Sequence, residues 1–151
     1  MTKLLIINGP NLGNIGRREP EIYGHEDFEP FLESLRKKFP ENEINYFQSH
    51  HEGEIVEKIH SAETEKYDGI ILNAGAYSHT SYSIRDAVAA IGLPVVMVHI
   101  SNVYAREYFR HENVIAAKCK GVITGFGLKS YELAVRSFSE RSFCLTNDWV
   151  V

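Results

Sequence analysis

The stretch Leu4-Leu5-Ile6-Ile7, followed by Asn8-Gly9-Pro10-Asn11, decides the fold of this chain. Four consecutive apolar residues that end at turn-forming residues are typical of a strand buried on both faces. Glycines and prolines forbid regular structure across residues 8–24, which also carry two arginines and a tyrosine. A long polar loop after the first strand of an α/β sheet lies where such folds bind ligands. We therefore expect a buried strand that leads into a binding loop.

The loop of residues 8–24 admits two interpretations. Gly, Pro and Asn are common in ordinary turns, and loop arginines are usually solvated. Alternatively, the loop is a lid that carries its own general base, Tyr23, with Arg18 close by. Bringing a tyrosine pKa from about 10 to near 7 takes roughly 4 kcal/mol. One or two guanidinium groups in a water-poor site can supply that stabilisation.

Composition places the chain among ordinary globular proteins. Its 151 residues predict one domain spanning residues 1–151, and 44% of them are hydrophobic and 24% charged. The net charge of −4 gives no basic field for nucleic acid or an anionic membrane. Cys119 and Cys144 have no CxxC spacing, and no apolar run approaches the length of a membrane span. The start runs directly into a strand without a signal peptide, so we expect a cytoplasmic protein.

Short apolar runs alternate with helical periodicities along the chain. Such alternation predicts a parallel sheet covered by helices on both faces, and at this length a flavodoxin-like strand order of 2-1-3-4-5. Ser81 is the expected cap of one helix, whose inward side chains would include Tyr82. The predicted strands are 4–7, 44–47, 69–72, 94–99 and 121–124, and the predicted helices are 28–39, 53–64, 81–91 and 128–138.

The predicted topology gathers polar residues at one edge of the sheet. The carboxyl ends of parallel strands share an edge, and the first and third strands flank the switch point of this order. Four loops would therefore bring polar groups into one crevice. These groups are Asn11, Arg18 and Tyr23 after the first strand, Asn73 to His79 after the third, His99 and Ser101 after the fourth, and Gly125 after the fifth.

Several chemistries lack their sequence signatures. There is no GxxxxGK[ST] or GxGxxG phosphate loop, no GxSxG elbow and no HExxH zinc motif. We therefore expect no metal site. Asparagines, histidines and arginines without a dominant carboxylate suit acid–base chemistry on a polyhydroxylated anionic small molecule. His99 is then either a core histidine or a general acid, and His79 either caps a helix start or binds the ligand.

Four motifs span almost the whole chain. They are NGPNLGNIGRREPEIYG at 8–24, FQSHHEGEIVEKIH at 47–60, ILNAGAYSHTSYSIRDA at 71–87 and VHISNVYAREYFR at 98–110. With these motifs the sequence resembles a known family, the type II 3-dehydroquinate dehydratases. The resemblance implies a flavodoxin-like fold, a dodecamer built of trimers, no cofactor, and elimination of water from 3-dehydroquinate through an enolate in the shikimate or quinate pathway.

The resemblance also implies residue roles. Tyr23, ionised with help from Arg18, would remove a proton from C2, and His99 would protonate the departing C1 hydroxyl. Asn11 would hold a water that stabilises the enolate. The implied substrate-binding residues are Asn73, His79, Ile100, Ser101 and Arg110, with Asp86 offered to a neighbouring subunit's site.

One position departs from the family pattern. Met97 stands two residues before His99, where the family would have a glutamate. Without a nearby carboxylate we expect a lower pKa for His99. Two other interpretations stay open: a non-enzymatic flavodoxin-like module that binds a nucleotide or flavin, and a catalytically silent paralogue.

Overall fold

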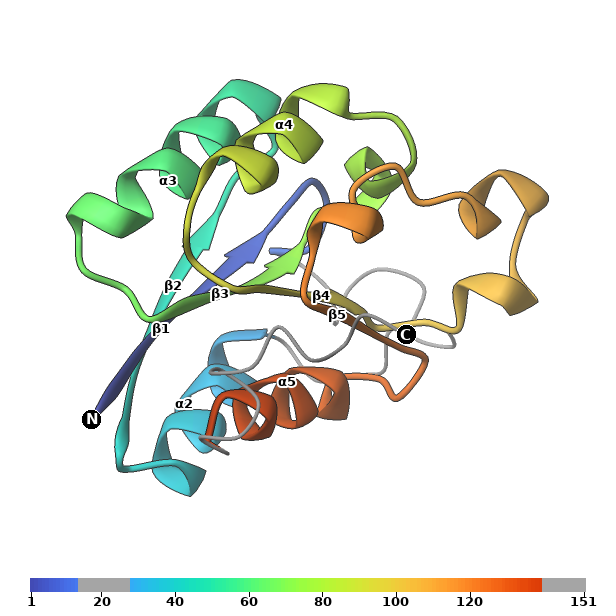
Figure 1. The fold of residues 1–151 in the computed structure, drawn as a ribbon. Helices are drawn as coiled ribbons and strands as arrows, with labels where there is room; N and C mark the ends of the chain where they lie inside the picture. The colour runs from blue at the N-terminus through green and yellow to red at the C-terminus, as the bar shows by residue number, and fades with distance from the viewer. Residues whose placement is uncertain (14–27, 140–151) are drawn as a thin grey trace, which may run out of the picture.

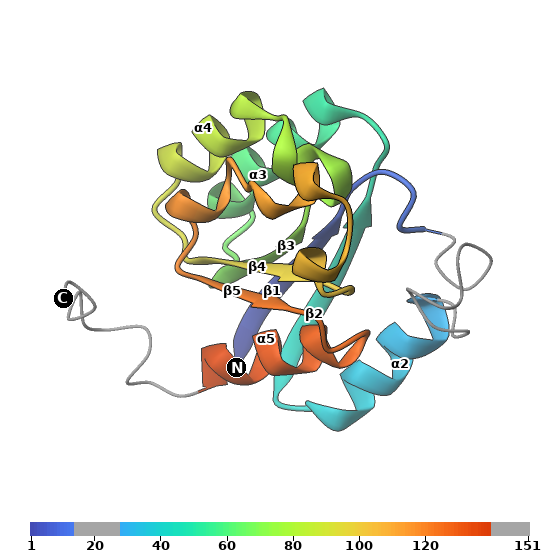
Figure 2. The same ribbon diagram turned by 90° about the vertical axis from the view of Figure 1, so that its right-hand side faces the viewer.

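A five-stranded parallel sheet organises the computed structural model, which describes residues 1–13 and 28–139. The strand order is β2-β1-β3-β4-β5, as the sequence predicts. Figure 1 shows α3 and α4 on one face of this sheet and α2 and α5 on the other, and the rotated view in Figure 2 agrees. The strands are β1 (Thr2–Asn8), β2 (Asn42–Gln48), β3 (Gly69–Asn73), β4 (Val95–His99) and β5 (Gly121–Thr124).

The helices follow the predicted apolar periodicities. Phe28, Phe31, Leu32 and Leu35 form the buried side of α2. The Ser81 side chain accepts a hydrogen bond from the Ile84 amide at 3.0 Å, so the predicted cap of α4 is confirmed. The helices are α2 (Phe28–Lys38), α3 (Glu52–Thr64), α4 (Tyr82–Ala90) and α5 (Lys129–Ser139).

The sheet separates two apolar cores because alternate strand residues point to opposite faces. Leu4 and Ile6 of β1 pack with α2 and α5, whereas Leu5 and Ile7 pack with α3 and α4. Both sets are almost fully buried. The uninterrupted apolar run of β1 therefore fills both cores at once.

Two features of the fold differ from the sequence prediction. Tyr82 was predicted to point inward, but its side chain is 65% exposed, because it occupies the first helical position on the outer side of α4. Within residues 1–13 and 28–139, the connections also contain four short 3₁₀ helices that apolar periodicity does not reveal. These are η2 (Gly75–His79), η3 (Val103–Ala105), η4 (Tyr108–His111) and η5 (Ala116–Lys118).

No helix within residues 1–13 and 28–139 is both long enough and apolar enough to cross a membrane.

Gly9 lets the loop after β1 approach the loop after β3. Its amide donates to the Asn73 carbonyl at 2.7 Å. A Cβ atom at Gly9 would lie 2.5 Å from the backbone oxygen of Ala74. Backbone cannot move aside as a flexible side chain can, so any larger residue would push apart the two loops that begin the crevice.

We expect Gly9→Ala to lower the free energy of unfolding by about 1–3 kcal/mol through overpacking. Gly53→Ala is the matched control, because nothing lies within 4 Å of a Cβ atom at this position in α3. The control should raise stability by about 0.5–1 kcal/mol, as expected for replacing a helical glycine. Urea denaturation of both variants measures the difference. Equal stability changes would contradict the close approach at Gly9.

Candidate active site

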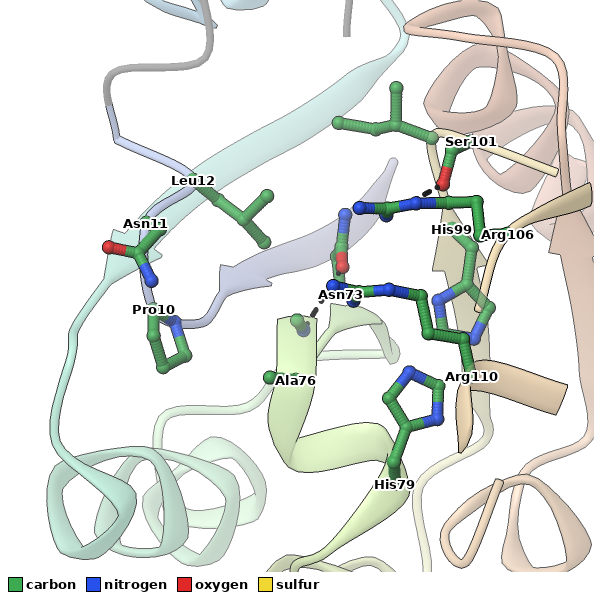
Figure 3. Close-up of a pocket in the computed structure, with 12 residues that line it drawn as sticks. Pro10, Asn11, Leu12, Asn73, Ala76, His79, His99, Ser101, Arg106 and Arg110 are labelled. Atoms are coloured by element: carbon green, nitrogen blue, oxygen red, sulfur yellow. Dashed lines mark hydrogen bonds between the residues drawn. The ribbon is translucent and has the colours of Figure 1, made fainter. Parts of the chain in front are cut away.

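A pocket lies at the carboxyl edge of the sheet, over the ends of β1, β3 and β4. Its walls come from the loops after these three strands and from η2 and η4, as Figure 3 shows. The lining residues are Pro10, Asn11, Leu12, Asn73, Gly75, Ala76, His79, His99, Ile100, Ser101, Arg106 and Arg110. Three of the four loops predicted to form a crevice therefore line this pocket, whereas Gly125, in the loop after β5, does not.

A buried hydrogen-bond chain forms the floor of the pocket. Asn73 donates from Nδ2 to the Tyr131 hydroxyl at 2.9 Å, and that hydroxyl donates to Oδ1 of Asn8 at 2.7 Å. Oδ1 of Asn73 accepts from the Gly75 amide at 3.2 Å. Burial raises the pKa of Tyr131, so its hydroxyl keeps its proton and remains a donor. These contacts fix the Asn73 amide and leave its second N–H for the pocket.

Two guanidinium groups extend across the pocket toward Asn73. Figure 3 shows Arg106 and Arg110 reaching in from the same side. Arg106 donates to the Ser101 hydroxyl at 3.2 Å, and Nε of Arg110 pairs with Glu107 at 2.6 Å. Glu107 is exposed and lies outside the pocket lining. The side that Arg106 and Arg110 form is suited to an anionic or polyhydroxylated ligand.

His79 and His99 stand next to each other in the pocket wall. Their rings are stacked at an interplanar angle of 10°, with centroids 6.3 Å apart. Nδ1 of His79 lies 2.5 Å from the Glu112 carbonyl oxygen, which can only accept a hydrogen bond. Nδ1 of His79 therefore carries a hydrogen, and its Nε2 is an acceptor in the neutral ring. His79 does not cap a helix here, so the ligand-facing interpretation is favoured.

His99 ends β4 and is 7% exposed. Burial of the ring is the larger cause and the neighbouring His79 the smaller one, and together they lower the pKa of His99 to about 4. The ring is therefore neutral at pH 7. In the unfolded chain the histidine pKa is near 6.5. Protonation of His99 in the unfolded chain therefore lowers the free energy of unfolding as pH falls from about 6.5 to 4.

Asn113 contacts His99 from behind the pocket. Its Nδ2 lies 3.0 Å from Nε2 of His99 and 2.8 Å from the sulfur of Met97. Its Oδ1 accepts from the Ile115 amide at 3.0 Å and from the Ala116 amide at 2.9 Å. Met97 therefore meets Asn113, which in turn meets the ring of His99.

The structure brings together most of the residues predicted for the site. Seven of them line the pocket: Asn11, Asn73, His79, His99, Ile100, Ser101 and Arg110. Asp86 is exposed on α4 and does not line this pocket. Arg18 and Tyr23 lie outside the described residues, so their predicted roles remain predictions.

Sequence reasoning missed Arg106 and Asn113. Arg106 falls within the quoted motif at 98–110, four residues before Arg110, and this spacing could have suggested a shared direction. Asn113 gave no such signal, because it follows an irregular segment and reaches His99 only through the fold. Within residues 1–13 and 28–139, no group of three or more His, Cys, Asp or Glu side chains could hold a metal ion.

Comparison with known proteins gives relatives over nearly the whole chain. A 3-dehydroquinate dehydratase from Caldicellulosiruptor bescii is 53% identical over 142 residues, which cover 93% of this chain and 98% of the relative. The 3-dehydroquinate dehydratase of Bacillus subtilis is 51% identical over 143 residues, covering 90% and 93%. Both likenesses therefore cover at least nine-tenths of this chain.

Solved structures of similar fold point to the same family as these relatives. The type II dehydroquinase from Butyrivibrio crossotus DSM 2876 superposes with a TM-score of 0.89 at 44% identity, covering 92% of this chain and 98% of that one. The family model described as "Dehydroquinase class II" matches residues 2–139. The chain thus belongs to the class II dehydroquinase family.

Proposed function

We propose that this protein is a type II 3-dehydroquinate dehydratase, a hydro-lyase that converts 3-dehydroquinate to 3-dehydroshikimate and water. The observation that carries the proposal is the pocket in which two arginines, two histidines and the Asn73 amide meet. These side chains can bind hydroxyls and an anionic group, and the His99 ring can donate a proton. The family relationship supplies the substrate class.

The proposed reaction is an elimination in two stages. Tyr23, as tyrosinate held by Arg18, takes the proton from C2, and the C–H electron pair forms an enolate with the neighbouring ketone. A water held by Asn11 stabilises the enolate oxygen. The enolate then collapses and the C1–O bond breaks with its electron pair on oxygen. This oxygen takes a hydrogen from His99 and leaves as water, after which the proton on Tyr23 returns to His99 through solvent.

We propose that the remaining pocket residues hold the substrate. Asn73, His79 and Arg110 would bind ring hydroxyls, because each presents a polar group to the pocket. Ser101 and the Ile100 amide would bind the carboxylate, with Arg106 beside them through its 3.2 Å contact to Ser101. Asp86 would contribute to a neighbouring subunit's site from its exposed position on α4.

The proposal is tested by incubating the purified protein with 3-dehydroquinate and following the absorbance of the conjugated 3-dehydroshikimate. We expect turnover that EDTA leaves unchanged, because the proposed chemistry uses no metal. A protein that shows a flavin absorption band and no turnover would instead support the binding-module alternative.

Tyr23→Phe should lower kcat by at least 10²–10⁴-fold, because it removes the proposed general base. Tyr67→Phe is the matched control, since it also removes one phenolic hydroxyl but lies at the other end of the sheet beside Lys3. The control should retain wild-type kcat. Steady-state kinetics of both variants, with melting temperatures to verify folding, provide the measurement. If Tyr23→Phe keeps more than a tenth of the wild-type kcat, another group is the base.

Arg106→Gln should raise KM by at least tenfold, because a charged hydrogen bond to an anionic ligand is worth about 1.5–3 kcal/mol. Arg136→Gln loses the same charge on α5, where Arg136 pairs with Glu132 at 3.1 Å. The control should leave KM within twofold of the wild type. An unchanged KM in Arg106→Gln would remove this arginine from substrate binding.

We further propose that the protein is a cytoplasmic homododecamer, a tetramer of trimers, built from a single domain spanning residues 1–151. An exposed aromatic cluster around η3 and η4 supports assembly, because large apolar patches usually mark subunit contacts. The cluster consists of Tyr104, Tyr108 and Phe109, which are 65%, 79% and 57% exposed.

Light scattering at micromolar concentration should give a mass near about twelve times that of one 17.2 kDa chain. Tyr108→Lys should reduce this mass, because it places a charge in the proposed contact. Lys120→Glu, a charge change outside the aromatic cluster, should leave the assembly intact. A monomer in the wild type would contradict the proposal.

A further inference from the structure

We propose that Asn113 is a positioning residue that holds His99 as the neutral ring with its hydrogen on Nδ1. The catalytic role of His99 in this inference rests on the proposed function. The tautomer of the ring depends only on the contact between Asn113 and His99. It assigns the ring nitrogen that supplies the hydrogen to the leaving group. It also assigns a task to a residue outside the predicted site.

Two backbone contacts fix the orientation of the Asn113 amide. Its Oδ1 accepts hydrogen bonds from two backbone amides, those of Ile115 and Ala116. Turning the amide over would place an NH₂ group against two N–H donors and leave all three without acceptors. Nδ2 therefore faces His99, and the group it presents to the ring is a donor.

Nδ2 of Asn113 lies within hydrogen-bond distance, 3.0 Å, of Nε2 of His99. Since Asn113 donates, Nε2 must accept, and a neutral imidazole that accepts at Nε2 carries its hydrogen on Nδ1. An imidazolium would bring two N–H groups face to face. Asn113 thus selects one tautomer and opposes protonation of the ring at Nε2.

The segment around Asn113 is anchored on both histidines. The Glu112 carbonyl lies 2.5 Å from Nδ1 of His79, and the Val114 amide donates to the Ser78 carbonyl at 2.8 Å. Three consecutive residues are therefore tied to η2 and β4 together. Because the Val114–Ser78 bond joins two backbone groups and the contacts on either side of it reach the two rings, the segment holds the rings at a fixed separation.

The charged and titratable groups around His99 do not offset the effect of Asn113. His79 from η2, Arg106 and Arg110 share its pocket, while Tyr104 and His111 line a second pocket behind it. Among the described residues that line these two pockets, none carries a carboxylate. The sulfur of Met97 also contacts Nδ2 of Asn113, where it accepts only weakly. No described group that lines the two pockets therefore stabilises the imidazolium form of His99.

The consequence for the reaction is that His99 acts as a neutral donor. When the C1–O bond breaks, its electron pair moves to oxygen, which takes the hydrogen of Nδ1 and leaves as water. The N–H bond pair stays on the ring, and the Asn113 N–H at Nε2 stabilises the charge that develops there. The proton that Tyr23 removed from C2 then restores Nδ1 through solvent.

Asn113→Asp tests the proposal with little change of shape. One carboxylate oxygen can still accept from the Ile115 and Ala116 amides, while the other faces Nε2 and now requires a hydrogen there. We expect the His99 pKa to rise by roughly 1–3 units, as for an opposite charge at this range. Asn45→Asp in β2 adds the same charge next to Glu43 and is the control.

The primary readout is the ¹⁵N NMR spectrum of the ring, assigned by comparison with His99→Gln. In the wild type at pH 7 we expect a hydrogen on Nδ1 and none on Nε2, with no titration of His99 between pH 5 and 8. Asn113→Asp should move the hydrogen to Nε2, and Asn45→Asp should not. A wild-type ring protonated on Nε2, or an unchanged ring in Asn113→Asp, would overturn the proposal.

The second readout is kcat as a function of pH. Above the raised pKa, the ring of Asn113→Asp has no hydrogen on Nδ1, so the ratio of its kcat to the wild-type value should fall as pH rises from 5 to 8. KM should change much less. A ratio independent of pH would contradict the positioning role. If the wild type shows no turnover, the proposed function fails, while the NMR result still decides the tautomer.

Discussion

The hydroxyl of Tyr131 makes the contact on which the arrangement of the site depends. It bridges Asn8 at the end of β1 and Asn73 at the end of β3, two residues that are also paired in the sheet register. A buried hydroxyl between two side-chain amides needs a hydrogen bond to each of them. A buried polar group without a partner there would lower the stability of the fold by about 1–3 kcal/mol. The bridge therefore connects α5, the switch point and the pocket floor.

Much of the fold could be predicted because the apolar pattern and the topology rules agree. The buried run of β1, the helical spacing in α2 and the cap at Ser81 each appear in the structure. The connections were less predictable. Short 3₁₀ helices such as η3 and η4 form without an apolar stripe, and Tyr82 shows that a helical position near a cap can point outward.

The sequence predicts the site residues that directly follow a strand, because the parallel sheet determines their position. Asn73 and His99 follow β3 and β4 directly, so the parallel sheet alone places them together. Arg106 and Asn113 reach the same place from irregular segments, where position depends on tertiary contacts that no local pattern encodes. The reduced basicity of His99 follows first from burial and then from His79, rather than from the missing carboxylate at position 97 alone. Tyr23 and Arg18 lie outside the described residues and still rest on sequence.

The contact between Met97 and Asn113 also bears on how this site can evolve. The Met97 sulfur and the His99 ring both contact Nδ2 of Asn113, so a substitution at position 97 or 113 changes the hydrogen bonds open to the residue at the other position. A carboxylate at position 97 would compete with the histidine ring for the same amide hydrogens. Substitutions at positions 97 and 113 are therefore epistatic. Replacing only one of the two residues by that of a relative would leave the His99 ring beside a group that does not fit its hydrogen-bonding state.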